Sequence, residues 1–111
     1  MARTSGAGSD PVGQALLLPL IHGRVRLLVL SFLLRKNKAV SFTALRDELK
    51  LTDGTLSVHL SKLELGKLLK QEKTFVGKRP LTMVKMTPRG RRLFQQYVMD
   101  LKSVVPGLEQ D

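Results

Sequence analysis

The sequence contains no cysteine and no tryptophan, and it has only five aromatic residues, four Phe and one Tyr. Without a thiol the chain can form no disulfide, no thiolate metal site and no thiol redox switch. A chain of this kind is compatible with the reducing cytoplasm, which we predict as its location. The missing tryptophan and the scattered basic residues also argue against binding to a membrane surface, which would favour a basic amphipathic helix with aromatic anchors.

A long uninterrupted hydrophobic run is missing as well. The apolar region from residue 16 to residue 34 is broken by residues that are polar, charged or disfavoured in a helix: Pro19, His22, Gly23, Arg24 and Arg26. A membrane span needs about 20 consecutive apolar residues, so we interpret this region as part of a soluble core and expect no membrane contact.

The patterns of common catalytic and cofactor sites are missing too. The sequence has no HExxH, CxxC, GxGxxG or Walker motif, and it has only two histidines, His22 and His59. We expect His59 to be half-buried and to pack or bond to the backbone, with a phosphate contact as the second reading and a metal ligand as the third. Asp47 and Glu48 are neighbours on a predicted helix and point in different directions, so they do not form an acid/base pair. We predict no enzyme activity, no cofactor and no metal site.

Acidic residues are few in relation to basic ones. The chain has 19 Lys and Arg against 9 Asp and Glu, a net charge of +10 and a pI near 10.6. Such an excess is typical of a protein with a polyanionic partner, since the compact state must bear its own charge repulsion. The length of 111 residues predicts one domain, which we place at residues 14–105 between a loose N-terminal tail, residues 1–13, and a C-terminal tail, residues 106–111.

The segment from residue 51 to residue 66, LTDGTLSVHLSKLELG, predicts a short helix with defined ends. Thr52 can accept a hydrogen bond from an amide of the first turn, and Asp53 suits the positive end of the helix dipole. Gly66 is expected to supply the left-handed residue that ends the helix. Three leucines at helical spacing form the inner face: Leu56, Leu60 and Leu63.

The outer face of this helix carries small side chains and one cation, so a wide partner could approach it closely. A nucleic-acid groove fits this description, since hydroxyl groups can bond base edges or phosphates and valine methyl groups can meet a thymine methyl. The alternative is a plain solvated helix surface of low charge. The residues predicted to face the groove are Thr52, Gly54, Thr55, Ser57, Val58, Ser61 and Lys62.

Two more helices are expected before this one. Val25 to Lys36 has helical apolar spacing, although the helix could begin as early as Gln14. Residues 40–42 could form a very short strand or only the entry to a helix over residues 43–50. That helix and the next are joined by about three to four residues, which is the spacing of a helix-turn-helix.

After Gly66 the pattern changes to the alternation of strands, with a second strand from Leu81 to Met86. The intervening VGKRP places Lys78 and Arg79 at the tip of a hairpin. A tip of two cations is commonly only solvated. In a chain of this charge we favour contact with phosphates or a minor groove.

Thr87 and Pro88 predict the start of a long final helix, with Thr as the cap and Pro in the first position. Its apolar stripe exceeds what one small core would cover, as do the leucines upstream of the first long helix. One reading is a wholly intramolecular core helix, and the reading we favour is a dimer contact. The residues predicted for that contact are Leu16, Leu17, Leu20, Leu93, Phe94, Tyr97, Val98, Leu101 and Val105.

The words LTDGTLSVHLSKLELGKL and FVGKRPLTMVKMTPRGRRLF, in this order, resemble the small winged helix-turn-helix transcriptional regulators of the broad MarR and ArsR group of bacteria and archaea. The resemblance covers residues 20–105. It implies a mainly α fold with a small β-hairpin, in the order helix, short strand, helix, recognition helix, two-stranded wing and long C-terminal helix. The sequence departs from the family pattern at HGRVR, where a His-Ser-Pro-Val-Arg type of helix start is expected.

The resemblance further implies a homodimer that binds double-stranded DNA, with each recognition helix in a major groove and half-sites about 34 to 36 Å apart. By position, the seven outer residues named above would face the groove, Lys78 and Arg79 would be wing contacts, and Arg46 would contact a phosphate. We expect a sequence-specific regulator, and more specifically a repressor. The alternatives are a winged helix that docks a protein or RNA, and a regulator that also binds an unidentified small-molecule effector.

Overall fold

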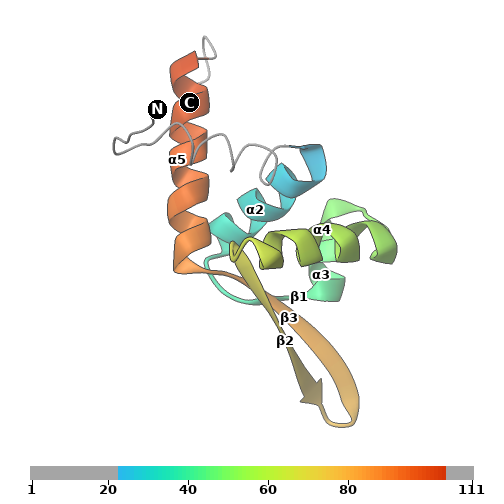
Figure 1. Cartoon of the computed structure of the whole chain (residues 1–111). Coiled ribbons are helices and arrows are strands. Elements are labelled where there is room, and N and C mark those ends of the chain that lie inside the picture. Colours follow the sequence, from blue (N-terminus) through green and yellow to red (C-terminus); the bar gives the residue numbers. More distant parts are fainter. Residues whose placement is uncertain (1–22, 105–111) are drawn as a thin grey trace.

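Four helices and three strands make up residues 23–104, which are the residues that this computed structural model describes (Figure 1). In chain order they are α2 (Arg24–Lys36), β1 (Val40–Ser41), α3 (Phe42–Leu49), α4 (Asp53–Leu65), β2 (Leu69–Val76), β3 (Arg79–Met86) and α5 (Pro88–Val104). This order confirms the predicted winged helix-turn-helix arrangement, with α4 as the recognition helix and β2 and β3 as the wing.

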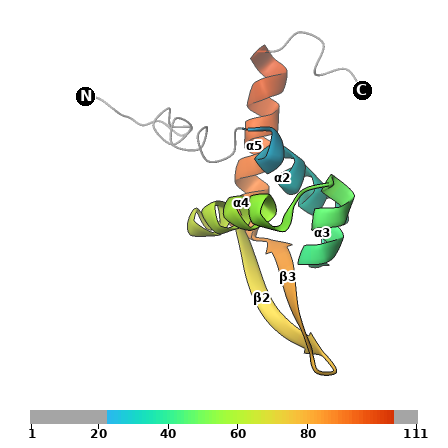
Figure 2. The same ribbon diagram turned by 90° about the vertical axis from the view of Figure 1, so that its right-hand side faces the viewer.

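The helices α2, α3 and α4 form the body of the domain, and two long elements leave it in opposite directions (Figures 1 and 2). One is α5, and the other is the β2–β3 hairpin. The strands form one antiparallel sheet in the order β1-β3-β2. The pairing of β1 with β3 is short, Val40 with Val84 and Ser41 with Met83, so most of the hairpin extends beyond β1 as a two-stranded arm.

The helix boundaries follow from local hydrogen bonds. α2 begins at Arg24 directly after Gly23, whose φ is 118°, so of the possible starts left open by the sequence the later one holds for this helix. The Ser41 hydroxyl accepts a hydrogen bond from the Ala44 amide at 3.1 Å and starts α3, which explains why residues 40–42 serve both as strand and as helix entry. Three residues, numbers 50–52, separate α3 from α4, as expected for a helix-turn-helix.

The recognition helix α4 begins as predicted and ends differently. The Thr52 hydroxyl accepts a hydrogen bond from the Thr55 amide at 3.1 Å. At the other end Gly66 has φ −79°, and the left-handed residue is Lys67 at φ 63°. The Leu68 amide donates to the Leu63 carbonyl at 3.0 Å, the bond that closes a Schellman motif. The left-handed residue that ends the helix, predicted to be Gly66, is therefore Lys67. The turn at Lys67 brings the fully buried Leu68 into the core.

The core lies where the helices meet the base of the sheet, and the described residues include no buried polar or charged side chain. The predicted inner face of α4 is confirmed, since Leu56, Leu60 and Leu63 are all 0% exposed. The other core residues are Val29, Leu30, Phe32, Leu33, Val40, Leu45, Leu68, Leu69, Val84, Met86, Phe94 and Tyr97. Burial on this scale holds α4 rigidly from behind.

The first turn of α5 is packed against the junction of α4 and β2. The Thr87 hydroxyl accepts from the Gly90 amide at 2.9 Å, which confirms the predicted cap, and it donates to the Lys67 carbonyl at 2.7 Å. The Thr87 amide donates to the Leu68 carbonyl at 3.1 Å. A Cβ atom on Gly90 would lie 1.9 Å from that same Leu68 oxygen, so only glycine allows this approach.

Candidate nucleic-acid interface

The outer face of α4 is open along its length. All seven residues predicted to face a groove are exposed, and Val58 keeps 53% of its surface accessible. A Cβ atom on Gly54 would meet nothing within 4 Å, so no packing within the described part of the chain requires glycine at this position. The structure thus places small polar side chains, one valine and Lys62 on one accessible helix face that is supported by three buried leucines.

Arg46 joins α3 to the beginning of α4. Its Nε donates to Asp47 Oδ1 at 2.9 Å, and its Nη1 donates to Asp53 Oδ1 at 2.8 Å. These hydrogen bonds, first with Asp47 and then with Asp53, raise the pKa of the Arg46 guanidinium above its ordinary value. Both carboxylates are well exposed, so the pairs add little to stability, and only the pair with Asp53 links α3 to α4. A phosphate contact by Arg46 stays a prediction.

A cleft separates α4 from the wing. Glu64 of α4 holds the two sides together, since its carboxylate accepts from the Gln71 amide at 3.2 Å and from Gln71 Nε2 at 2.9 Å. The cleft has a volume of about 410 Å³ and is lined by Phe42, Ser57, Glu64, Gln71, Lys73 and Thr82. The charge-assisted bonds of Glu64 tie the beginning of the wing to the recognition helix.

His59 is partly buried on α4 and contacts α2, as predicted for a half-buried packing residue. Its Nδ1 accepts a hydrogen bond from Arg26 Nε at 3.1 Å. Burial lowers the pKa of His59, and the nearby charges of Arg26 and Lys62 lower it further. A neutral imidazole can accept this bond and a protonated one cannot, so the contact depends on the neutral form.

The wing ends in the two-residue turn of Gly77 and Lys78. Gly77 has φ 64°, which suits the first position of a type II′ turn. Lys78 lies at the tip as predicted, and Arg79 is the first residue of β3, paired with Val76. Every residue from 72 to 80 is exposed. Both predicted wing cations are therefore accessible at the end of the arm.

Positive charge dominates the sequence of the wing and the start of α5. Between Glu72 and Asp100 there are seven Lys and Arg residues and no acidic residue. Two of these cations have structural partners: Arg89 Nε donates to the Gly66 carbonyl at 3.2 Å, and Arg91 Nη2 donates to Asn37 Oδ1. Positive charge therefore lies at the helix junctions as well as along the wing.

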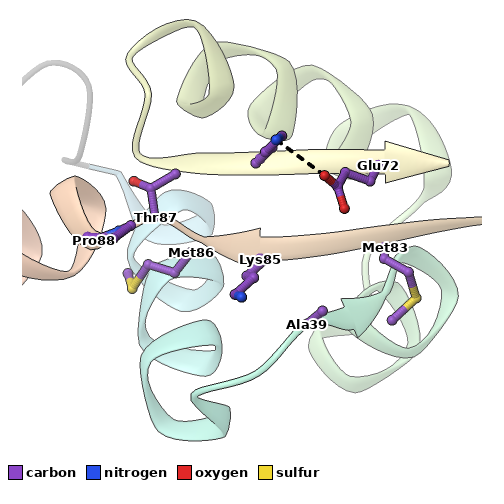
Figure 3. A pocket seen from close by; sticks show the side chains of 8 residues that line it. Ala39, Glu72, Met83, Lys85, Met86, Thr87 and Pro88 are labelled. Atoms are coloured by element: carbon purple, nitrogen blue, oxygen red, sulfur yellow. Dashed lines mark ion pairs between the residues drawn. The ribbon is translucent and has the colours of Figure 1, made fainter.

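A second groove lies on the opposite face of the sheet (Figure 3). Its volume is about 280 Å³, and its lining combines methionines with an ion pair between Lys70 and Glu72 at 3.2 Å. The lining residues are Ala39, Lys70, Glu72, Met83, Lys85, Met86, Thr87 and Pro88. Because side chains alternate along a strand, this groove faces away from the cleft beside α4.

The residues predicted for a dimer contact divide into three groups. Phe94 and Tyr97 are 3% and 6% exposed and stack on each other with ring centroids 6.4 Å apart, so they belong to the core of the single chain and we withdraw them from the interface. Half-buried residues that border this core are Leu93, Val98 and Leu101. The remaining four lie outside the described residues: Leu16, Leu17, Leu20 and Val105.

Sequence reasoning missed two polar contacts of this region. Glu64 bonds to a residue seven positions away on another element, and Arg26 bonds to His59 across 33 positions. It also gave no role to Met99 of α5, which is 63% exposed and lies on the opposite side of the helix from the apolar stripe, whereas Val104, 72% exposed, continues that stripe. No sequence pattern marks the two polar pairs.

Within residues 23–104 no helix is long and apolar enough to cross a membrane. The same residues contain no group of three or more His, Cys, Asp or Glu side chains placed to hold a metal ion.

Comparison with known proteins agrees with this geometry. The sequence model of a winged helix DNA-binding domain matches residues 25–105. An uncharacterised protein of Methanocaldococcus jannaschii is 33% identical over 86 residues, which cover 78% of this chain and 90% of that protein.

Solved structures show the same likeness. A transcriptional regulator homologue from Pyrococcus horikoshii OT3 has a TM-score of 0.76 at 30% identity, with 88% of this chain and 96% of that chain covered. The transcriptional repressor PagR of Bacillus anthracis has a TM-score of 0.58 at 27% identity, with 76% and 91% covered.

Proposed function

The chain belongs to the family of winged helix DNA-binding domains, and from this premise we propose that it is a transcriptional regulator that binds specific sites on double-stranded DNA as a homodimer. In this proposal α4 lies in the major groove and the wing contacts the minor groove or the backbone. The observation that carries it is the outer face of α4, which is exposed, carries mostly small side chains together with Lys62 and, at the last residue of the helix, Leu65, and is supported from behind by buried leucines.

The side chains of α4 have the chemistry for reading bases. Hydroxyl groups of Thr55, Ser57 and Ser61 can donate to or accept from base edges, and the exposed Val58 can contact a thymine methyl group. Lys62 supplies a cation beside this row. The exposed Lys78 and Arg79 on the wing suit phosphates, which position the protein without reading sequence.

A homodimer is supported by α5. Beyond the part that covers the core, this helix exposes Val104, and on the same side Leu93, Val98 and Leu101 are only half-buried. A second copy that covers this surface would remove apolar area from water. A symmetric pair then presents two copies of α4, and half-sites about 34 to 36 Å apart fit two such helices on one side of a duplex.

We further propose that regulation is repression and that the protein acts in the cytoplasm. Repression is supported by the similarity to the Bacillus anthracis protein, whose name describes a repressor. The small-molecule effector stays a prediction without assigned residues.

Selection of duplexes from fragmented genomic DNA, followed by gel shift, tests the proposal. We expect selected duplexes to bind far more tightly than random duplex at the same salt concentration, and to contain two related half-sites. The substitution Ser61→Gln should weaken binding to the selected site more than to random duplex, because a longer side chain disturbs base contacts. Ser103→Gln, at an exposed position near the far end of α5, is the control and should leave binding unchanged.

Two results would refute the proposal. One is failure to bind any duplex at low salt, which would favour a winged helix that docks protein or RNA. The other is equal affinity for all sequences together with equal effects of the two substitutions.

A further inference from the structure

The end of the wing carries apolar side chains in full contact with solvent. Phe75 is 65% exposed and Val76 is 64% exposed, and both lie directly before the turn of an arm that projects from the body of the domain (Figures 1 and 2). A phenylalanine at such a position contributes nothing to the core. Large exposed apolar side chains of this kind are typical of surfaces that meet a partner.

Phe75 and Pro80 form one apolar unit on one face of the wing. They are opposite each other in the strand register, so their side chains share a face. Proline has no N–H group to exchange in the ladder, so this pair must be of the type without mutual hydrogen bonds, in which side chains approach most closely. The pair is therefore a flat hydrophobic edge made of a ring from each strand.

This edge lies on the face of the wing that looks towards α4. Side chains alternate along a strand, so Phe75 points to the same side as Lys73 and Gln71. Gln71 is bonded to Glu64 of α4, and Lys73 lines the cleft beside that helix. Val76, next to Phe75 and equally exposed, points to the opposite side.

The surroundings of the edge are cationic. Lys73, Lys78 and Arg79 flank Phe75, whereas the nearest acidic residue, Glu72, points to the opposite face of the wing and pairs with Lys70 at 3.2 Å. An apolar group surrounded by positive charge has little affinity for another copy of the same wing, because the cations repel each other. It complements a partner with negative charge on its outer surface and flat apolar groups within. DNA is such a partner, because its phosphates are negative and the stacked bases lie between them in the groove.

We propose that Phe75, backed by Pro80, is a wedge that enters the minor groove, partly unstacks one base step and bends the duplex. The inference rests on the proposed function, because it needs DNA held against α4. Apolar side chains inserted in this way bend DNA towards the major groove, and flexible pyrimidine–purine steps accept the distortion at the lowest cost. The wing then selects sequence by deformability at positions that α4 does not touch.

Fluorescence of 2-aminopurine tests the wedge, with the analogue placed in turn at each step of a duplex recovered by selection on the whole protein. Wild-type protein should raise the emission at one step in each half-site, and energy transfer between dyes on the two ends should report a bend. Phe75→Ala should abolish both signals and reduce affinity by about tenfold. Val76→Ala removes a similarly exposed side chain from the other face and should leave both signals intact.

Lys78→Ala serves as a second control. It should lower affinity and reduce the salt slope by about one while the bend persists. Thermal unfolding of each variant should match wild type, because none of these side chains is buried.

A duplex that binds tightly without unstacking or bending would overturn the wedge and leave the proposed function standing. So would equal loss of signal in the Phe75 and Val76 variants. A change in the oligomeric state of Phe75→Ala without DNA would show that the edge contacts a second copy instead. Absence of binding to every duplex would instead overturn the proposed function.

Discussion

Gly54 offers a sharp test, because stability and DNA affinity should change in opposite directions when it is replaced. It occupies the second position of α4, and a Cβ atom there meets nothing within 4 Å in the described structure. Alanine in place of glycine stabilises a helix by up to about 1 kcal/mol in its interior and by less in the first turn, so we expect a gain of about 0.5 kcal/mol. For a domain of this size that gain raises the Tm by about 2 to 4 °C.

The same methyl group would separate the backbone of α4 from a groove that approaches it. Forcing a methyl group into a close contact costs about 1 to 3 kcal/mol, so Gly54→Ala should weaken binding to the selected duplex by about tenfold. Gly54→Gln, with a longer side chain that also suits a helix, should weaken it further. Calorimetry gives the Tm, and a fluorescence anisotropy titration gives the affinity. If affinity stays constant or rises in both variants, Gly54 does not face the groove and our orientation of α4 is refuted.

Three further predictions concern the wing, the charge and pH. Glu64→Ala removes the acceptor of both Gln71 hydrogen bonds, so the wing should lose its fixed angle to α4. The affinity for DNA should fall while the Tm changes little, and a large loss of Tm would show that these bonds stabilise the core instead. If the dimer neutralises about six phosphates, log affinity should fall with log salt at a slope of about −5, and a flat response would exclude phosphate-driven binding. The pKa of His59 is lowered from 6.5 in the folded chain, so below that pH the unfolded chain binds more protons and the free energy of unfolding should fall as pH falls. His59→Gln should flatten this pH dependence in urea titrations, and an unchanged dependence of the free energy of unfolding on pH would contradict the prediction.

Features that depend on neighbouring residues could be predicted from the sequence. The caps at Thr52 and Thr87 are local hydrogen bonds, and the leucine spacing of α4 fixes which side is buried. The same local rules assigned the left-handed position to Gly66, because glycine adopts it at the lowest cost. The chain uses Lys67 instead, since the burial of Leu68 decides which residue must turn.

Features that depend on distant elements could not be predicted. An apolar stripe on α5 shows that one face of the helix is buried, but not whether it is buried by the same chain or by a second copy. The sequence therefore predicts a dimer contact for Phe94, which lies in the core of the single chain. The bond between Glu64 and Gln71 requires the angle between helix and strand, which no periodicity contains. The exposure of Phe75 likewise depends on how far the hairpin extends beyond β1.

The close seat of α5 on the α4–β2 junction has a mechanical consequence. Gly90 leaves no room for even a methyl group against the Leu68 carbonyl, and two hydrogen bonds of Thr87 hold the same spot. The first turn of α5 therefore cannot rotate unless the beginning of β2 and the end of α4 move with it. In a pair of chains joined through α5, any tilt of the joined helices would directly change the spacing between the two α4 helices and between the two wings.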